Sequence, residues 1–206
     1  MKVIGNKKIA NKNRTSVVRL TKIGMLAGVS FVLMLFQVPL PFAPPFYQID
    51  LSEAPVLIGT FALGPFAGMA IEFVKILLNL LVNGTTTVGV GELANFIIGC
   101  SFVIPAGMIY KKRQTRKSAI IGMMVGVMCM VIFGCLLNAY VLLPVYATAF
   151  NMPIDGLIEM GTAVNAGITD LLTFVVYAVA PFNLLKGIVV SAIVVMIYKK
   201  ISRVLR

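Results

Sequence analysis

The chain has 206 residues, of which 59% are hydrophobic and only 12% are charged, and its mean hydropathy is +0.98. A soluble domain carries about a quarter charged residues, so this composition leaves too little polar surface for a globule in water. The net charge of +11 would suit nucleic acid as a partner, but the distribution of the basic residues excludes it. Seven lie in 1–22, five in 111–117 and four in 199–206, between long apolar stretches. This pattern is typical of the cytoplasmic loops of a multi-pass protein in the cell membrane.

The apolar stretches predict where the helices cross the bilayer. A membrane helix needs about 20 apolar residues, and the first predicted one is 23–40. The stretch 54–82 is too long for one helix, and Gly64-Pro65 interrupts it. We therefore predict two helices there. The predicted helices after the first are 53–63, 66–83, 92–110, 118–143 and 170–198.

The positions of the basic residues agree with six membrane helices. With a cytoplasmic N-terminus, six helices place 111–117 and 199–206 in the cytoplasm, whereas five would place 111–117 outside. The three outer segments would be 39–52, 83–91 and 144–169, and none contains Lys or Arg. We predict an all-α membrane protein, a six-transmembrane-helix bundle with both termini cytoplasmic. The whole chain, 1–206, forms one domain: a basic N-terminus (1–22), the bundle (23–198) and a basic C-terminus (199–206).

Enzymatic chemistry finds no support in the sequence. The chain has no His, and its three Cys residues lie in apolar runs without a CxxC pair. Neither a Ser-His-Asp set nor a zinc site is therefore expected. No GxxxxGK[ST] loop occurs, so the chain has no recognisable means of using ATP. We expect no catalytic residue, no metal and no cofactor.

Several ionisable residues fall within or beside the predicted helices, where burial of a charge is costly and often marks a functional site. Glu72 and Lys75 are three residues apart on one helix face, as a structural ion pair or as ligand contacts. Glu92 opens the fourth helix, where it would either cap the helix or contact a ligand. Asp170 at the start of the last helix is interpreted as a cap.

Lys186 is the best single candidate for a ligand contact. It lies in the middle of the last predicted helix, with no acid within four positions, so its ammonium needs a partner from elsewhere in the bundle. Asn183 shares its helix face, and Asn138 and Asn95 are further amides within apolar runs. Amides can also hold helices together without binding a ligand. A Lys and several amides around one cavity would suit a polar, ring-shaped small molecule.

The outer segment 39–52 is rich in Pro and aromatic residues, which makes it stiff and non-helical. Phe42, Phe46 and Tyr47 would cover an apolar ligand face or form an interfacial aromatic belt. Gln48 follows them as a polar candidate. The glycine- and threonine-rich segment 83–91 is expected to be a loop able to close over a site.

Small residues gather on one side of the first helix. Gly24 and Gly28 form a G-x-x-x-G motif with Ala27 beside them, and this motif allows close helix approach. It would serve packing inside the bundle or the docking of a second membrane subunit.

Three stretches resemble a known family: PLPFAPPFYQIDLSEAPVLIGTFALGPFAGMAIEFVKILLNLL, GVGELANFIIGCSFVIPAG and LLNAYVLLPVY. They are similar to the riboflavin-specific substrate-binding subunits (S components) of energy-coupling-factor (ECF) vitamin transporters, over about residues 20–200. The resemblance implies a six-helix subunit with a flavin site near its outer face, capped by the first loop. It also implies association with a membrane coupling subunit and two ATPase subunits that supply the energy.

The resemblance assigns residues to the ligand as well. Asn138 and Lys186 would contact the isoalloxazine ring, with Glu92 and Asn95 as further candidates. Gly24, Ala27 and Gly28 would take the place of the family's Ala-x-x-x-Ala docking pattern, which Phe31 interrupts here. The ligand would be riboflavin, with its phosphorylated form FMN as a second possibility. The alternatives are an S component for another vitamin, a self-sufficient secondary transporter and a membrane scaffold.

Overall fold

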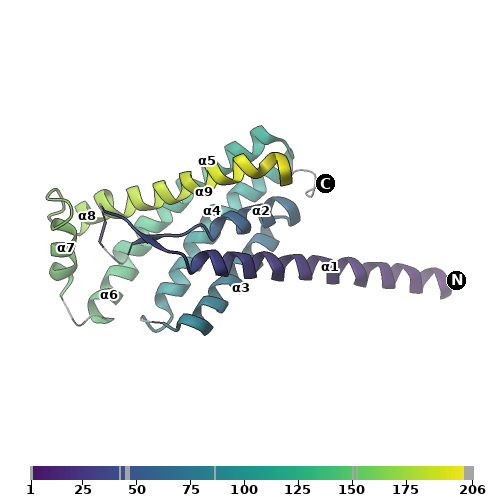
Figure 1. The fold of residues 1–206 in the computed structure, drawn as a ribbon, viewed down its shortest axis with the longest axis horizontal. Helices are drawn as coiled ribbons and strands as arrows, with labels where there is room; N and C mark the ends of the chain where they lie inside the picture. The colour runs from purple at the N-terminus through teal and green to yellow at the C-terminus, as the bar shows by residue number, and fades with distance from the viewer. Residues whose placement is uncertain are drawn as a thin grey trace.

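The computed structural model describes residues 2–41, 43–44, 47–85, 87–149, 151 and 153–201. In these ranges the chain is almost entirely helical (Figure 1). The α-helices are α1 (Lys2–Met34), α2 (Glu53–Leu63), α3 (Pro65–Asn83), α4 (Val90–Lys112), α5 (Arg116–Leu137), α6 (Leu143–Ala149), α7 (Ile154–Thr162), α8 (Leu171–Phe174) and α9 (Ala180–Ile201). Two π-helical turns, η1 (Asn138–Leu142) and η2 (Val175–Val179), join α5 to α6 and α8 to α9.

Five helical segments within the described ranges are long and apolar enough to cross a membrane: Ser16–Met34, Pro65–Asn83, Val90–Lys112, Arg116–Ala149 and Leu171–Tyr198. The predicted helix 53–63 is present as α2, but it has only 11 residues. At 1.5 Å per residue such a helix is about 16 Å long, roughly half the hydrocarbon core. The structure therefore shows, within the described ranges, five helical segments able to cross a membrane and the shorter α2.

The short helix α2 lies inside the bundle. It packs against α1, α3, α4 and α9, and eight of its 11 residues are buried. Because other helices surround α2, it does not have to cover the full thickness of the hydrocarbon core by itself. Its predicted end is confirmed, because Gly64 has φ +96°, a conformation that favours glycine, and Pro65 then occupies the first turn of α3.

The first helix ends earlier than predicted. The sequence predicted a helix to Leu40, but α1 ends at Met34, and that boundary is wrong. The chain becomes extended instead, and β1 (Val38–Pro39) pairs antiparallel with β2 (Gln48–Ile49). Prolines at 39 and 41 explain the difference, because Pro lacks a backbone N–H and drives the residue before it to extended backbone. The result is a short hairpin between α1 and α2, and residues 35–52 form the hairpin segment.

The buried apolar residues form two clusters. The larger one lies between α1, α2, α3, α4, α5 and α9 and includes Leu57, Phe102 and Met130. The smaller one joins the hairpin segment to η1, α6, α7 and η2 through Tyr47 and Phe174. The predicted outer segment 144–169 thus contains two helices, α6 and α7, that cover this second cluster.

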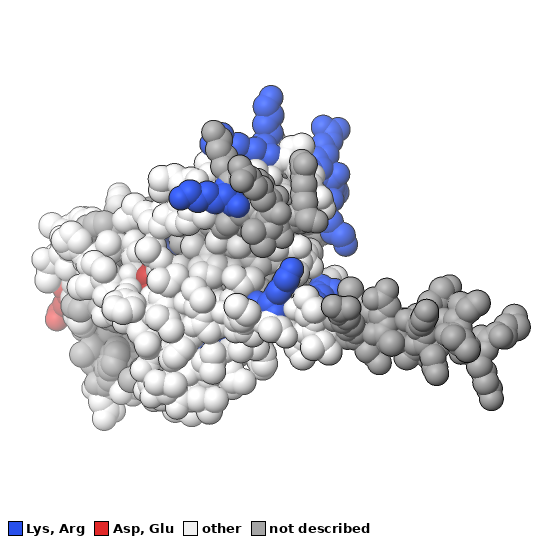
Figure 2. All heavy atoms as spheres, turned by 45° about the vertical axis from the view of Figure 1, so that its right-hand side comes forward, with Lys and Arg blue, Asp and Glu red and all other residues white. Residues whose placement is uncertain are grey.

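The basic residues gather at the opposite end. Helix α1 begins and α9 ends at the same end of the bundle, and the turn between α4 and α5 lies there too (Figure 1). Lys and Arg side chains cluster on this end, whereas few acidic side chains appear in the same view (Figure 2). This distribution is the one that the positive-inside rule describes for a cytoplasmic face.

Candidate functional site

A cavity of about 330 Å³ opens at the end of the bundle away from the basic turns. It lies between the hairpin segment, the second half of α3, the first half of α4, the α5–η1 junction and the first half of α9. The polar residues that line it include Gln37, Tyr47, Gln48, Asp50, Glu53, Asn79, Glu92, Asn95, Asn138, Tyr146, Asn183 and Lys186. Ligand pockets have volumes of about 300–1,000 Å³, so the cavity is large enough for a small ring system.

Most of the residues that the sequence singled out meet here. Of the eight candidate ligand contacts, seven line this one cavity: Lys186, Asn138, Asn183, Glu92, Asn95, Tyr47 and Gln48. The eighth, Phe42, lies outside the described residues. Four separate parts of the chain therefore bring together one ammonium, four amides, one carboxylate and one phenol around the cavity.

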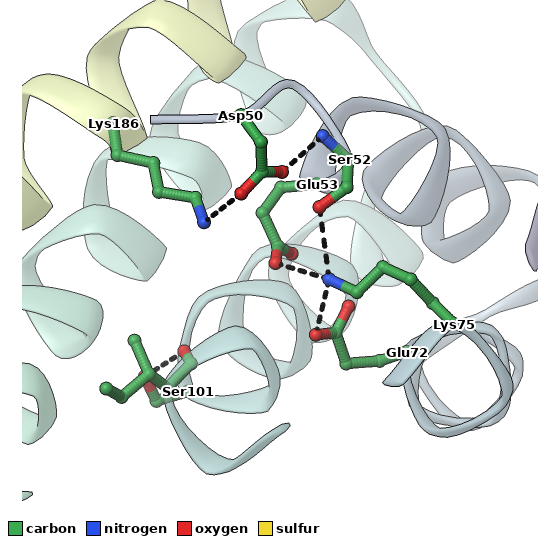
Figure 3. A network of polar contacts seen from close by, with 8 residues as sticks. Asp50, Ser52, Glu53, Glu72, Lys75, Ser101 and Lys186 are labelled. Atoms are coloured by element: carbon green, nitrogen blue, oxygen red, sulfur yellow. Dashed lines mark hydrogen bonds and ion pairs between the residues drawn. The ribbon is translucent and has the colours of Figure 1, made fainter. Parts of the chain in front are cut away.

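Lys186 forms an ion pair with Asp50 in the hairpin segment. Its ammonium Nζ lies 3.0 Å from Oδ2 of Asp50, and both side chains are buried. The two side chains point toward one another (Figure 3). Asp50 Oδ1 also accepts a hydrogen bond of 2.7 Å from the backbone N–H of Ser52. The pair thus ties the loop before α2 to the first half of α9.

The environment of Asp50 favours its charged form. Burial by itself would raise the pKa of this carboxyl, but the nearby ammonium groups of Lys186 and Lys75 and the hydrogen bonds from Ser52 outweigh it. The pKa is lowered from 3.8 to about 2. Asp50 is therefore a carboxylate at neutral pH, and it holds the positive charge of Lys186 in place.

A second ion cluster lies beside the first. The predicted pairing of Glu72 with Lys75 is confirmed, with 2.7 Å between Oε1 and Nζ. The structure adds Glu53 from the start of α2, whose Oε1 lies 2.8 Å from the same Nζ (Figure 3). Ser52 Oγ accepts a further hydrogen bond from Lys75 at 3.3 Å. Glu53 lines the cavity as well, so this cluster forms part of its floor.

The side-chain amides of Asn138 and Asn183 line the cavity and also form hydrogen bonds within the protein. Asn138 Nδ2 donates to the carbonyl of Gly134 at 2.7 Å, and Asn183 Nδ2 donates to that of Val179 at 2.9 Å. Asn138 Oδ1 accepts a hydrogen bond of 2.7 Å from the hydroxyl of Tyr47. Because Asn138 is in the π-helical turn η1, this bond fixes the hairpin segment against an irregular part of the fifth helix.

The Tyr47 ring closes one side of the cavity. It packs on Phe182 with 5.1 Å between ring centroids and on Phe174 with 6.3 Å. Tilted aromatic pairs at such distances add to the stability that burial provides. Tyr47 is thus a buried wall residue rather than part of an exposed aromatic belt.

Glu92 lies in the first turn of α4, as predicted. Its Oε2 accepts a hydrogen bond of 3.0 Å from the hydroxyl of Thr85, which in turn accepts from the backbone N–H of Gly89. The half-buried carboxylate therefore organises the 83–91 loop while it faces the cavity together with Asn95. Asp170 proves to be a helix cap, because its Oδ1 accepts from the backbone N–H of Thr173 in a capping box.

The small residues of α1 divide into two groups. Ala27 is fully buried in the larger apolar cluster, so it serves packing within the bundle. Gly24 is exposed and Gly28 half-buried, and a Cβ added at either would meet nothing within 4 Å. The surface of α1 at these two glycines is therefore not covered by other described residues.

Sequence reasoning missed Asp50 and Glu53 as cavity residues. A search by charge could have found Asp50, because Lys186 needed an acid and the chain has only seven. Nothing in the spacing identifies it, since the two residues are 136 positions apart. The cavity wall residue Tyr146 on α6 belongs to a segment in which the sequence offered no signal.

Comparison with known proteins places the chain in a family. The family model "ECF transporter, substrate-specific component" matches residues 18–198. The riboflavin transporter RibU of Staphylococcus aureus is 37% identical over 189 residues, which cover 91% of this chain and 92% of that protein. The riboflavin transporter FmnP of Bacillus subtilis is 34% identical over 187 residues, 90% and 93% of the two chains.

A solved structure has a similar fold. It is described as the S component of a bacterial ECF transporter, and it shares 34% sequence identity with this chain. The superposition has a TM-score of 0.72 and covers 93% of this chain and 99% of that one. The relatives are transporters rather than enzymes. This chain belongs to the family of substrate-specific components of ECF transporters.

Proposed function

We propose that this chain is the riboflavin-binding S component of an ECF transporter and takes up riboflavin from the outer face of the membrane. The observation that carries the proposal is the convergence of Lys186, Asn138, Asn183 and Asn95 on one cavity at the end away from the basic turns. The relatives named riboflavin transporters match over about nine-tenths of the chain, which supports the same ligand.

The cavity chemistry suits a flavin. An isoalloxazine ring has an apolar face and a polar pyrimidine edge with carbonyl and N–H groups. Tyr47, Phe182 and Leu142 supply apolar wall for the former, and the amides and Lys186 supply donors and acceptors for the latter. Convergent polar groups in a ligand pocket fix the orientation of the ligand. Gln48 and Glu92 would contact the polar edge or the ribityl chain.

The proposed topology has six membrane crossings with both termini in the cytoplasm. Five long helices and the enclosed α2 together give an even number of crossings. The start of α1 and the end of α9 accordingly lie at the same end of the bundle (Figure 1). The basic end of the molecule supports a cytoplasmic position for this face (Figure 2). A membrane-impermeant thiol reagent, applied to intact cells, should label a cysteine introduced at Asn165 and should not label one at Gln114.

The proposed partners are a membrane coupling subunit and two ATPases, since the chain has no nucleotide-binding loop of its own. The open space at Gly24 and Gly28 supports this face of α1 as the docking site. Replacing both glycines by Leu should leave riboflavin binding intact and reduce co-purification of the coupling subunit. Unchanged co-purification would exclude this face.

The decisive experiment is the visible absorption spectrum of the purified chain. A bound flavin absorbs visible light, so a yellow protein whose colour is released on denaturation and identified as riboflavin supports the proposal. Binding can then be titrated by quenching of flavin fluorescence, with FMN, thiamine and biotin as competitors. A colourless protein that binds another of these vitamins would contradict it. Uptake into liposomes by the chain alone would favour a secondary transporter instead.

A further inference from the structure

Five ionisable side chains are buried together beside the cavity, and three of them, Asp50, Glu53 and Lys186, line it. They are Asp50 (4% exposed), Glu53 (1%), Glu72 (0%), Lys75 (0%) and Lys186 (6%). Three are carboxyls and two are amines, so one carboxyl has no cation of its own. An uncompensated charge in such a place is strongly unfavourable. A positive charge other than the two amines must therefore neutralise the third carboxyl.

The excess carboxyl belongs to the pair Glu53 and Glu72. Asp50 is matched one to one with Lys186, and the backbone N–H of Ser52 bonds its other oxygen. Glu53 and Glu72, by contrast, share the single ammonium of Lys75 at 2.8 and 2.7 Å. The Oε2 atoms of both are buried and have no hydrogen-bond partner within the described part of the chain. Lys75 can thus balance only one of the two.

Among the described residues, the neighbouring elements supply no further cation. Helix α4 approaches the two carboxyls at Gly99, where an added Cβ would lie 2.5 Å from Glu72 Oε1 and 3.3 Å from Glu53 Oε1. Cys100 also faces the carboxyls from α4, and its thiol carries no positive charge in either protonation state. From the loop before α2, Ser52 contributes a neutral hydroxyl. The close approach at Gly99 also leaves little room for a hydrated ion.

We propose that Glu53 and Glu72 bind one proton between them at neutral pH, which makes the buried cluster electrically neutral. A proton needs no additional volume, and it allows one carboxyl to act as a donor. The site is built from α2 and α3, with α4 packed over it, so the proton stabilises the junction of these three helices. Loss of the proton would place two carboxylates on one ammonium and repel them from each other.

This arrangement links folding to the uptake of a proton. Glutamates in the unfolded chain are ionised at neutral pH, whereas the folded cluster retains one proton. The folded state then binds more protons than the unfolded state, and stability falls as the pH rises. One proton changes the folding equilibrium by at most about tenfold per pH unit. The effect continues until the folded cluster itself loses the proton.

The direct test is infrared spectroscopy of the purified, lipid-reconstituted chain without any ligand. A protonated carboxyl gives a C=O stretching band that carboxylates lack and that shifts in D₂O. We expect this band in the wild-type chain at pH 7. We expect its loss in both Glu53→Gln and Glu72→Gln, because each variant leaves one carboxylate for Lys75. Glu159→Gln, the same change at an exposed position on α7, should keep the band.

Thermal unfolding between pH 6 and 9 provides an independent measurement. The wild-type chain and Glu159→Gln should lose stability as the pH rises, and the two single cluster variants should lose less. A wild-type spectrum without the band overturns the proposal, since it would mean that another cation balances the charge. A band that survives in either cluster variant overturns the shared proton. Neither readout involves riboflavin, so the failure of this inference is distinguishable from that of the proposed function.

Discussion

The ammonium of Lys186 on α9 lies 3.0 Å from the carboxylate of Asp50, which stands in the loop before α2. The contact joins the cavity to the hairpin segment that covers it, and both partners line the cavity wall. A loop held by an ion pair in the cavity wall is sensitive to any ligand that binds one of the two charges.

Replacing Lys186 by Ala should weaken riboflavin binding at least tenfold in detergent. The substitution removes the cation of the cavity wall and leaves Asp50 buried without its partner, which disturbs the loop as well. Flavin fluorescence quenching measures the affinity, and size-exclusion chromatography checks that the variant is folded. Lys200→Ala, at an exposed position near the C-terminal end of α9, serves as the control and should bind normally. Equal affinities of the two variants for riboflavin would show that Lys186 does not contribute to its binding.

Replacing Asp50 by Asn should destabilise the fold near neutral pH but have a diminishing effect in acid. The pKa of Asp50 is lowered to about 2, so its carboxylate stabilises the folded state above pH ~4, and this contribution disappears as the pH falls toward 2. The shift corresponds to about 2 kcal/mol. Thermal unfolding of both proteins between pH 6 and 2 should show their difference shrinking. Asp155→Asn, at an exposed position, should differ little from the wild type at any pH.

Replacing Tyr47 by Phe should speed the dissociation of riboflavin about fivefold. The ring contacts with Phe182 and Phe174 remain, while the 2.7 Å hydrogen bond to Asn138 is lost. A buried hydrogen bond contributes about 1 kcal/mol, which corresponds to a factor of about five. Stopped-flow fluorescence after dilution measures the rate. An unchanged rate would show that the hydroxyl does not hold the loop over the bound ligand.

Replacing Gly99 by Ala should destabilise the bundle by about 1–3 kcal/mol. The new Cβ would lie 2.5 Å from Glu72 Oε1 and 2.7 Å from its Cδ, and the ion pair with Lys75 restrains this side chain from moving away. Gly24→Ala is the matched control, because its Cβ would meet nothing within 4 Å and Ala is the better helix former. Thermal unfolding in the same detergent compares the two. A Gly99→Ala variant as stable as Gly24→Ala would show that α4 has room to move.

The helical layout follows closely from local properties of the chain. The break at Gly64-Pro65 and the start of α4 near Glu92 agree with the sequence within a few residues. The end of α1 does not, because the prolines at 39 and 41 act on the residues before them and the hairpin then extends the irregular segment. The two π-helical turns were not predictable, since their sequences, NAYVL and VVYAV, are ordinary helix sequences.

The chain composition by itself determined that this is a membrane protein and which end carries the basic residues, because the partition of apolar and charged side chains between lipid and water depends on local sequence. It also made Lys186 conspicuous as a cation without a nearby acid. Only the tertiary structure decided that Asp50 is the acid and that Glu53 joins Glu72 at Lys75. These partners come from segments far apart in sequence, and their meeting depends on how α2, enclosed by α1, α3, α4 and α9, sets the position of the loop before it.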